Sequence, residues 1–151
     1  IAAASECQQA NSRRSSEVLE YFKGKRNHES VTIADVISLN VLEATQTLPV
    51  RYILTPTYSG STPRRISRFK PDCWILSFTH NTETHGFLML SYGVYSCVMD
   101  QPEESWDHVI LQFVKEMGLA ERGANMIITE GISSQQGGGW TNSMRIVTMA
   151  D

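Results

Sequence analysis

The feature that most constrains the fold is an alternation of short, nearly continuous apolar runs with longer stretches of helical periodicity. The apolar runs cover residues 50–55, 73–79, 94–99, 125–129 and 143–149. Strands of this kind are typically buried on both faces, and strands that alternate with helices form parallel βαβ units. We therefore predict an α/β three-layer sandwich, in which a five-stranded, mostly parallel sheet carries helices on both faces.

The last two apolar runs have no helical pattern between them, and the connection is short for a parallel crossover. We predict that the final strand is antiparallel to its neighbour. Helices are predicted over residues 5–22, 30–48, 63–69, 82–91 and 104–117. Ser30 is the predicted N-cap of the second helix and Pro49 ends it. Its buried stripe is Ile33, Ile37, Val41, Ala44 and Leu48.

Composition excludes several classes of protein. The 151 residues suit one domain, here 1–151, with residues 1–24 as an N-terminal helical segment. A net charge of −3 gives no reason to expect a nucleic-acid or membrane-surface partner. The three cysteines are far apart, as in a reduced, cytoplasmic protein. The chain starts at Ile1 rather than at a methionine, which leaves two alternatives open: a piece of a longer protein and a natural single domain.

The loop at residues 55–65, "TPTYSGSTPRR", joins the first strand to the next helix. Ligands of open α/β sheets bind beyond the carboxyl ends of the strands, where helix N-termini attract anions. Gly60 permits a tight turn, and Arg64 and Arg65 add charge. Thr62 is the predicted N-cap, with Pro63 at the first helical position. The loop is therefore either a phosphate cradle or an ordinary capped and solvated junction.

A second loop, residues 131–139, leaves the same edge of the sheet. Its glycines indicate close backbone approach to a ligand, a flexible lid, or a plain hairpin connection anchored by Trp140.

No other pattern points to catalysis. The sequence has no CxxC, HExxH, G-x-S-x-G, Walker or dinucleotide-binding motif, so we expect no metal site or bound cofactor. Cys97 lies in an apolar run and is expected to be a buried, inert thiol rather than a nucleophile.

Several segments, in order, resemble the C-terminal domain of pyruvate kinases. "SGST" (59–62) is similar to the Ser-Gly-x-Ser/Thr stretch of that family, and "RFKP" (68–71) to its Arg-Tyr-Arg-Pro. "THN" (79–81) resembles Thr-Arg-Asn, with His80 in place of the arginine. "TNSMR" (141–145) resembles Thr-Asn-x-Met-Arg.

The resemblance implies a regulatory domain without catalytic residues. Phosphoryl transfer from phosphoenolpyruvate to ADP, with magnesium and potassium, would take place in a preceding barrel. This domain would bind a sugar phosphate or another phosphorylated small molecule, and would form a homo-oligomer through helix 30–48 and the last strand. The implied phosphate-binding residues are Thr55, Thr57, Ser59, Gly60, Ser61, Thr62, Gly137, Gly138, Gly139 and Trp140.

The chain departs from the family in both loops. The first loop is longer, and "ISSQQ" replaces the Trp and Arg of the second, which removes a charge-assisted phosphate contact. This leaves a bisphosphate, a monophosphate or no ligand as alternatives. Two other functions stay open: an interaction module without a ligand, and a small hydrolase or transferase on the same fold.

Overall fold

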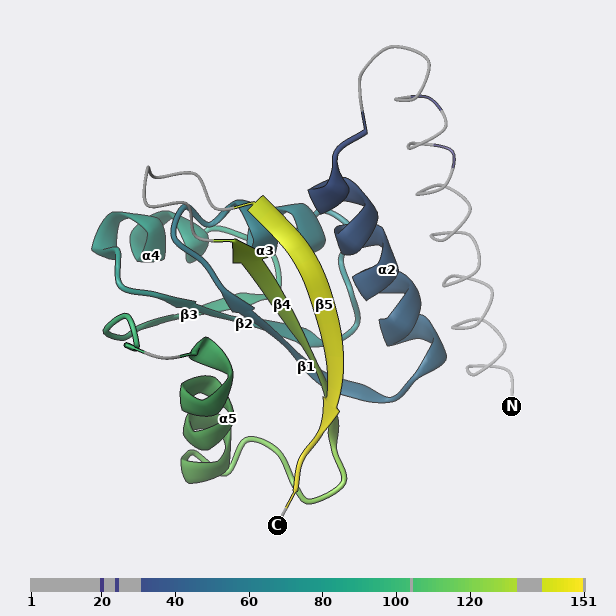
Figure 1. Ribbon diagram of the computed structural model, residues 1–151. Coiled ribbons are helices and arrows are strands. Elements are labelled where there is room, and N and C mark those ends of the chain that lie inside the picture. Colours follow the sequence, from purple (N-terminus) through teal and green to yellow (C-terminus); the bar gives the residue numbers. More distant parts are fainter. Residues whose placement is uncertain (1–19, 21–23, 25–30, 104, 133–139, 151) are drawn as a thin grey trace.

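The computed structural model describes residues 20, 24, 31–103, 105–132 and 140–150 (Figure 1). The predicted helix 5–22 and the N-terminal segment 1–24 lie outside these residues, apart from Glu20 and Gly24. The strands are β1 (Val50–Pro56), β2 (Trp74–Thr79), β3 (Val94–Val98), β4 (Asn125–Ile132) and β5 (Trp140–Thr148). The helices are α2 (Ile33–Thr47), α3 (Ser61–Ser67), α4 (Thr82–Leu88) and α5 (Trp106–Glu116).

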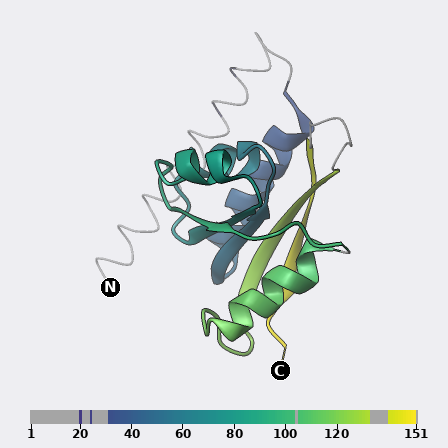
Figure 2. The same ribbon diagram turned by 90° about the vertical axis from the view of Figure 1, so that its left-hand side faces the viewer.

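The five strands form one sheet in the order β3-β2-β1-β4-β5. The β1–β2, β1–β4 and β2–β3 pairs are parallel, whereas β4 and β5 are antiparallel. The predicted fold class and the direction of the last strand are thus confirmed. Helices cover both faces, with α5 on one and α2, α3 and α4 on the other (Figures 1 and 2).

The core divides by the alternation of side chains along the central strands. Leu54, Leu76 and Ile128 face α5, where they pack with Ile110 and Val114. Their neighbours on the strands face the other way. Ile53, Ile75 and Ile127 pack with Val41 of α2, Ile66 of α3 and Leu88 of α4. Each central strand is therefore buried on both faces, which explains its unbroken apolar sequence.

Helix α2 begins later than predicted. Its N-cap is Thr32 rather than Ser30, because Thr32 and Asp35 form a reciprocal capping box: the Thr32 hydroxyl accepts from the Asp35 N–H, and Oδ2 of Asp35 accepts from the Thr32 N–H. The helix ends at Thr47. Leu48 is extended, as expected for a residue before proline. Leu48 is 37% exposed and Ile33 is 68% exposed, so the prediction that these two residues belong to the buried stripe is wrong.

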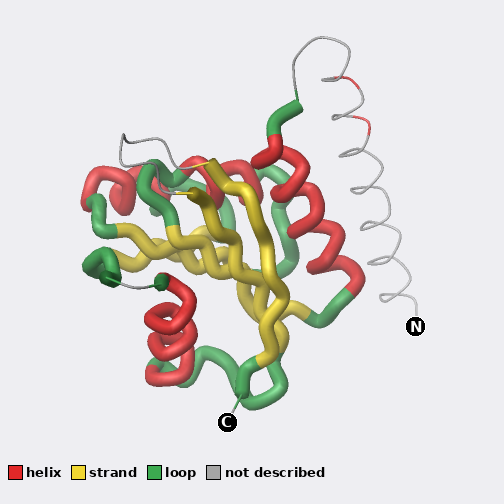
Figure 3. Tube along the Cα trace, in the orientation of Figure 1, coloured by secondary structure: helices red, strands yellow, loops and turns green. Residues whose placement is uncertain are grey.

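Other boundaries shift by a few residues (Figure 3). Helix α5 begins at Trp106 because the Ser105 hydroxyl caps it by accepting from the Asp107 N–H. Strands β4 and β5 extend their hairpin to the Ile132–Trp140 pair, beyond the predicted 125–129 and 143–149. Within the described part of the chain, no helix is long and apolar enough to cross a membrane.

Candidate functional site

The loop from β1 to α3 is fixed by three hydrogen bonds and by the packing of Gly60. The Thr57 N–H donates to the Phe78 carbonyl over 2.8 Å, which extends the pairing of β1 with β2. The Thr57 hydroxyl accepts from the Gly60 N–H over 2.9 Å. The Thr84 hydroxyl of α4 donates to the Tyr58 carbonyl, also over 2.9 Å. Gly60 itself is buried against α4. The loop therefore has a preformed shape.

Gly60 is the N-cap of α3, and its φ of 72° lies in the left-handed region. The predicted tight turn at Gly60 is confirmed. The prediction that Thr62 is the N-cap is wrong, because α3 already begins at Ser61 and Pro63 stands in its third position. No side chain caps this helix. Among described residues, no hydrogen bond occupies the backbone N–H groups of Ser61 and Thr62.

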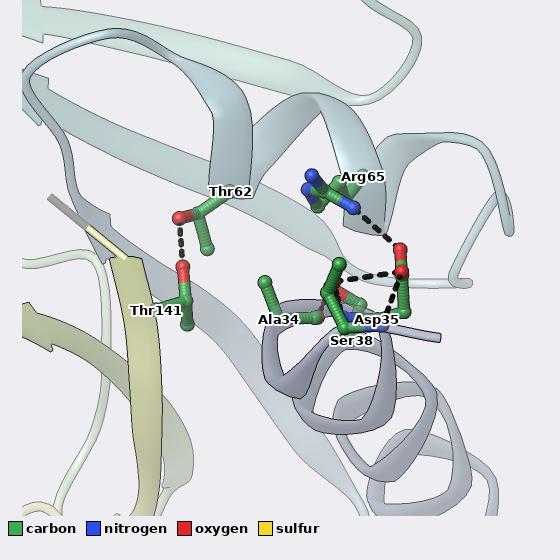
Figure 4. Close-up of polar contacts among 7 residues, drawn as sticks. Ala34, Asp35, Ser38, Thr62, Arg65 and Thr141 are labelled. Atoms are coloured by element: carbon green, nitrogen blue, oxygen red, sulfur yellow. Dashed lines mark hydrogen bonds and ion pairs between the residues drawn. The ribbon is translucent and has the colours of Figure 1, made fainter. Parts of the chain in front are cut away.

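Thr62 instead joins the two predicted loops. Its hydroxyl is hydrogen-bonded to that of Thr141, at the start of β5, and both residues are buried (Figure 4). Thr141 pairs with Gly131 in the β4–β5 ladder. The start of α3 and the base of the β4–β5 hairpin are therefore in direct contact, although the two threonines are far apart in the sequence.

Thr55 and Thr57 face inward. The Thr55 hydroxyl is fully buried and donates to the Leu76 carbonyl over 3.3 Å. The Thr57 hydroxyl is engaged by Gly60. Ser59 is exposed and Ser61 partly so. No hydrogen bond between described residues involves either serine hydroxyl. These two hydroxyls are the ones in the loop that can reach a ligand without breaking a described contact.

The two arginines expected to supply charge are directed elsewhere. Arg65 forms an ion pair with Asp35 of α2 (Figure 4). The guanidinium of Arg64 lies over the ring of Phe87 in α4, 5.2 Å from the ring centroid. The start of α3 thus offers neutral donors, while its positive side chains are engaged by neighbouring helices.

The second loop is described only at its base. Trp140 is the first residue of β5 and pairs with Ile132. Gly137, Gly138 and Gly139 lie outside the described residues. The Thr62–Thr141 contact nevertheless ties this base to the first loop.

The remaining candidates from the sequence are Cys97 and His80. Cys97 is half-buried rather than buried. Its partial burial raises the pKa of the thiol, which favours the protonated, less reactive form. His80 packs against the Tyr58 ring, with 5.3 Å between the ring centroids. Among the described residues, no group of three or more His, Cys, Asp or Glu side chains could hold a metal ion.

Two residues that organise the site were not singled out from the sequence: Asp35 and Thr84. Asp35 carried a detectable signal, since an acidic residue three positions after Thr32 is the pattern of a capping box. Thr84 acts through a contact with a distant segment, for which the sequence gives no local pattern. Thr141 was named only as part of the resemblance at 141–145, and its contact with Thr62 was not expected.

Comparison with known proteins supports the resemblance. Residues 35–147 match the family described as pyruvate kinase, alpha/beta domain. The chain is 41% identical over 115 residues to a pyruvate kinase of Thermococcus litoralis, covering 76% of this chain and 24% of the relative. It is 31% identical over 144 residues to that of Geobacillus stearothermophilus, covering 91% and 24%.

A solved structure, Cryptosporidium parvum pyruvate kinase in complex with ADP, superposes with a TM-score of 0.68 at 26% identity. The match covers 80% of this chain and 24% of the other. The chain thus spans about a quarter of the length of the relatives that it matches.

Proposed function

This chain belongs to the pyruvate kinase alpha/beta domain family, and we propose that it is the regulatory domain of a pyruvate kinase that binds a phosphorylated small molecule at the loops 55–62 and 131–140. The conversion of phosphoenolpyruvate and ADP to pyruvate and ATP would belong to the rest of such a protein. A cytoplasmic location is also part of the proposal. It is supported by Cys73 and Cys97, the two cysteines among the described residues, which are not in disulfides.

The contact between Thr62 and Thr141 carries the proposal. It supports a single site with contributions from both loops, at the carboxyl edge of the sheet where open α/β folds bind ligands. The available donors there are the N–H groups of Ser61 and Thr62 and the hydroxyls of Ser59 and Ser61. Convergent N–H and hydroxyl groups are suited to the oxygens of a phosphate.

The charge around the site favours a ligand with one phosphate group. Arg65 is paired with Asp35, and Arg64 lies on Phe87. The second loop has no arginine between residues 131 and 140. A second phosphate would therefore lack the charge-assisted partner that usually offsets its desolvation. We expect sugar monophosphates to bind at least as well as bisphosphates.

Calorimetric and thermal-melting titrations of the chain with glucose 6-phosphate and fructose 1,6-bisphosphate test the proposal. A ligand that binds the folded state raises the melting temperature with its concentration. We expect Ser61→Asp to abolish the shift, because its carboxylate repels phosphate while it suits the first turn of α3. Ser105→Asp, at the cap of α5, is the matched control. The absence of heat and melting shift with either ligand would contradict the binding proposal.

The interaction module without a ligand is the second candidate, and exposed apolar side chains favour it. Ile33 on α2 is 68% exposed and Ile146 on β5 is 46% exposed. Association through α2 and the last strand would cover both. Sedimentation velocity over a hundredfold range of concentration tests this candidate: Ile33→Lys should shift an oligomer toward monomer, whereas a wild-type monomer throughout excludes it.

A further inference from the structure

We propose that Thr84 of α4 is a positioning residue for the phosphate-binding loop. Its hydroxyl holds the peptide group between Tyr58 and Ser59 in the orientation in which the Ser59 N–H can bind a phosphate. The inference deepens the proposed function and rests on it, because it concerns the geometry of the same loop. Thr84 lies outside the predicted site residues and belongs to a different helix.

The hydrogen bond from Thr84 sets the direction of one backbone donor. Its hydroxyl donates to the Tyr58 carbonyl over 2.9 Å. A trans peptide is planar, so the N–H of the next residue points opposite to that carbonyl. Because the Tyr58 carbonyl is turned toward α4, the Ser59 N–H is turned away from α4. Thr84 thereby keeps the Ser59 N–H free of α4, so that it can join the donors at the start of α3 in binding a phosphate.

Thr84 also fixes the other side of Ser59. A Cβ on Gly60 would lie 3.2 Å from the Thr84 methyl, 3.1 Å from Phe87 and 3.2 Å from Leu88. The loop therefore packs directly on this face of α4, and the Gly60 N–H is directed back to Thr57. Residues 58 and 60 are both held, which leaves Ser59 between two anchored neighbours.

The anchor is itself rigid. Thr84 is 4% exposed, in the first turn of α4. Its N–H and that of Glu83 both donate to the side chain of Asn81, the N-cap of the helix. The Asn81 N–H in turn donates to the Thr79 hydroxyl at the end of β2. A chain of hydrogen bonds through the first turn of α4 thus connects the loop to the end of β2 in the central sheet.

The test compares Thr84→Val, which keeps the shape of the side chain but removes the donor, with Thr84→Ser, which keeps the donor. Thr82→Val, at an exposed position of the same helix, is the control. NMR titration with inorganic phosphate measures affinity, and amide hydrogen exchange at Thr57 and Gly60, whose N–H groups are hydrogen-bonded, measures the order of the loop. We expect Thr84→Val to weaken phosphate binding about fivefold to tenfold, as one lost hydrogen bond would.

Exchange at Thr57 and Gly60 should accelerate in Thr84→Val, while α5 amides keep their protection. Thr84→Ser and the control should match the wild type within twofold in phosphate affinity and in exchange rate. Unchanged affinity and exchange in Thr84→Val would overturn the role of Thr84. If the wild type itself binds no phosphate, the proposed function fails, and the exchange rates at Thr57 and Gly60 still decide whether Thr84 orients the loop.

Discussion

At Gly60 the backbone conformation and the packing both exclude a side chain. Its φ of 72° costs a residue with a Cβ roughly 1–2 kcal/mol, and that atom would press on Thr84, Phe87 and Leu88. We predict that Gly60→Ala lowers the free energy of unfolding by at least that amount. In the control Gly86→Ala, nothing lies within 4 Å of the new Cβ. Since Gly86 is inside α4, alanine there should stabilise by about 0.5–1 kcal/mol. Urea denaturation measures the free energy of unfolding of both variants, and equal changes in Gly60→Ala and Gly86→Ala would contradict the prediction.

At this scale the sequence predicted the tight turn at Gly60 but not the partners of its neighbours. A glycine among small hydroxyl residues is a local signal, and the turn followed from it. Thr62 was misassigned because its hydroxyl has two competing uses, a cap for α3 and a partner across the fold. In the structure the Thr62 hydroxyl is hydrogen-bonded to Thr141, and only the tertiary structure brings those two residues together.

An ion pair joins helices α2 and α3. Asp35 is 8% exposed, closes the capping box of α2 and pairs with Arg65 of α3. We predict that Asp35→Asn destabilises the fold by about 1–2 kcal/mol, because the amide can still cap α2 but leaves the half-buried guanidinium without its counter-charge. Glu43→Gln, at an exposed position of α2, should change stability by less than about 0.5 kcal/mol. Thermal unfolding of both variants measures these changes. If Asp35→Asn is as stable as the wild type, the ion pair contributes nothing to the stability of the fold.

Elements were easier to predict than their ends. Each described helix and strand was expected from the sequence pattern, whereas α2 and α3 begin at N-caps other than the predicted Ser30 and Thr62. Ser30 and Thr32 are both suitable caps, and the choice depends on which residue has an acidic partner three positions later. Asp35 provides that partner for Thr32, so the capping-box pattern in the sequence indicates the N-terminus of α2.

The fold class and the direction of the last strand followed from the sequence because few topologies are compatible with its pattern, whereas the strand order β3-β2-β1-β4-β5 was not predicted. Apolar strands separated by helices require a parallel sheet covered on both faces, and the short β4–β5 connection requires an antiparallel end. The candidate site did not follow in the same way. Its two loops were expected at one edge of the sheet, but the engagement of Arg64 by Phe87 and of Arg65 by Asp35 depends on side-chain packing between separate helices.

Burial of the cysteines makes the stability of the whole domain sensitive to alkaline pH. Burial raises the pKa of Cys73 from 9.0 to about 11, and the nearby Asp72 acts in the same direction. The folded state therefore holds this proton more tightly than the unfolded state. Its contribution to stability is complete below pH 9, decreases as the unfolded thiol ionises, and is lost by about pH 11.

Tyrosines and lysines titrate in the same range, so the comparison must be with Cys73→Ala. We predict that the difference in unfolding free energy between wild type and Cys73→Ala decreases from pH 8 to pH 10.5, measured by urea denaturation under reducing conditions. A difference that stays constant would mean that the Cys73 thiol ionises equally well in the folded domain.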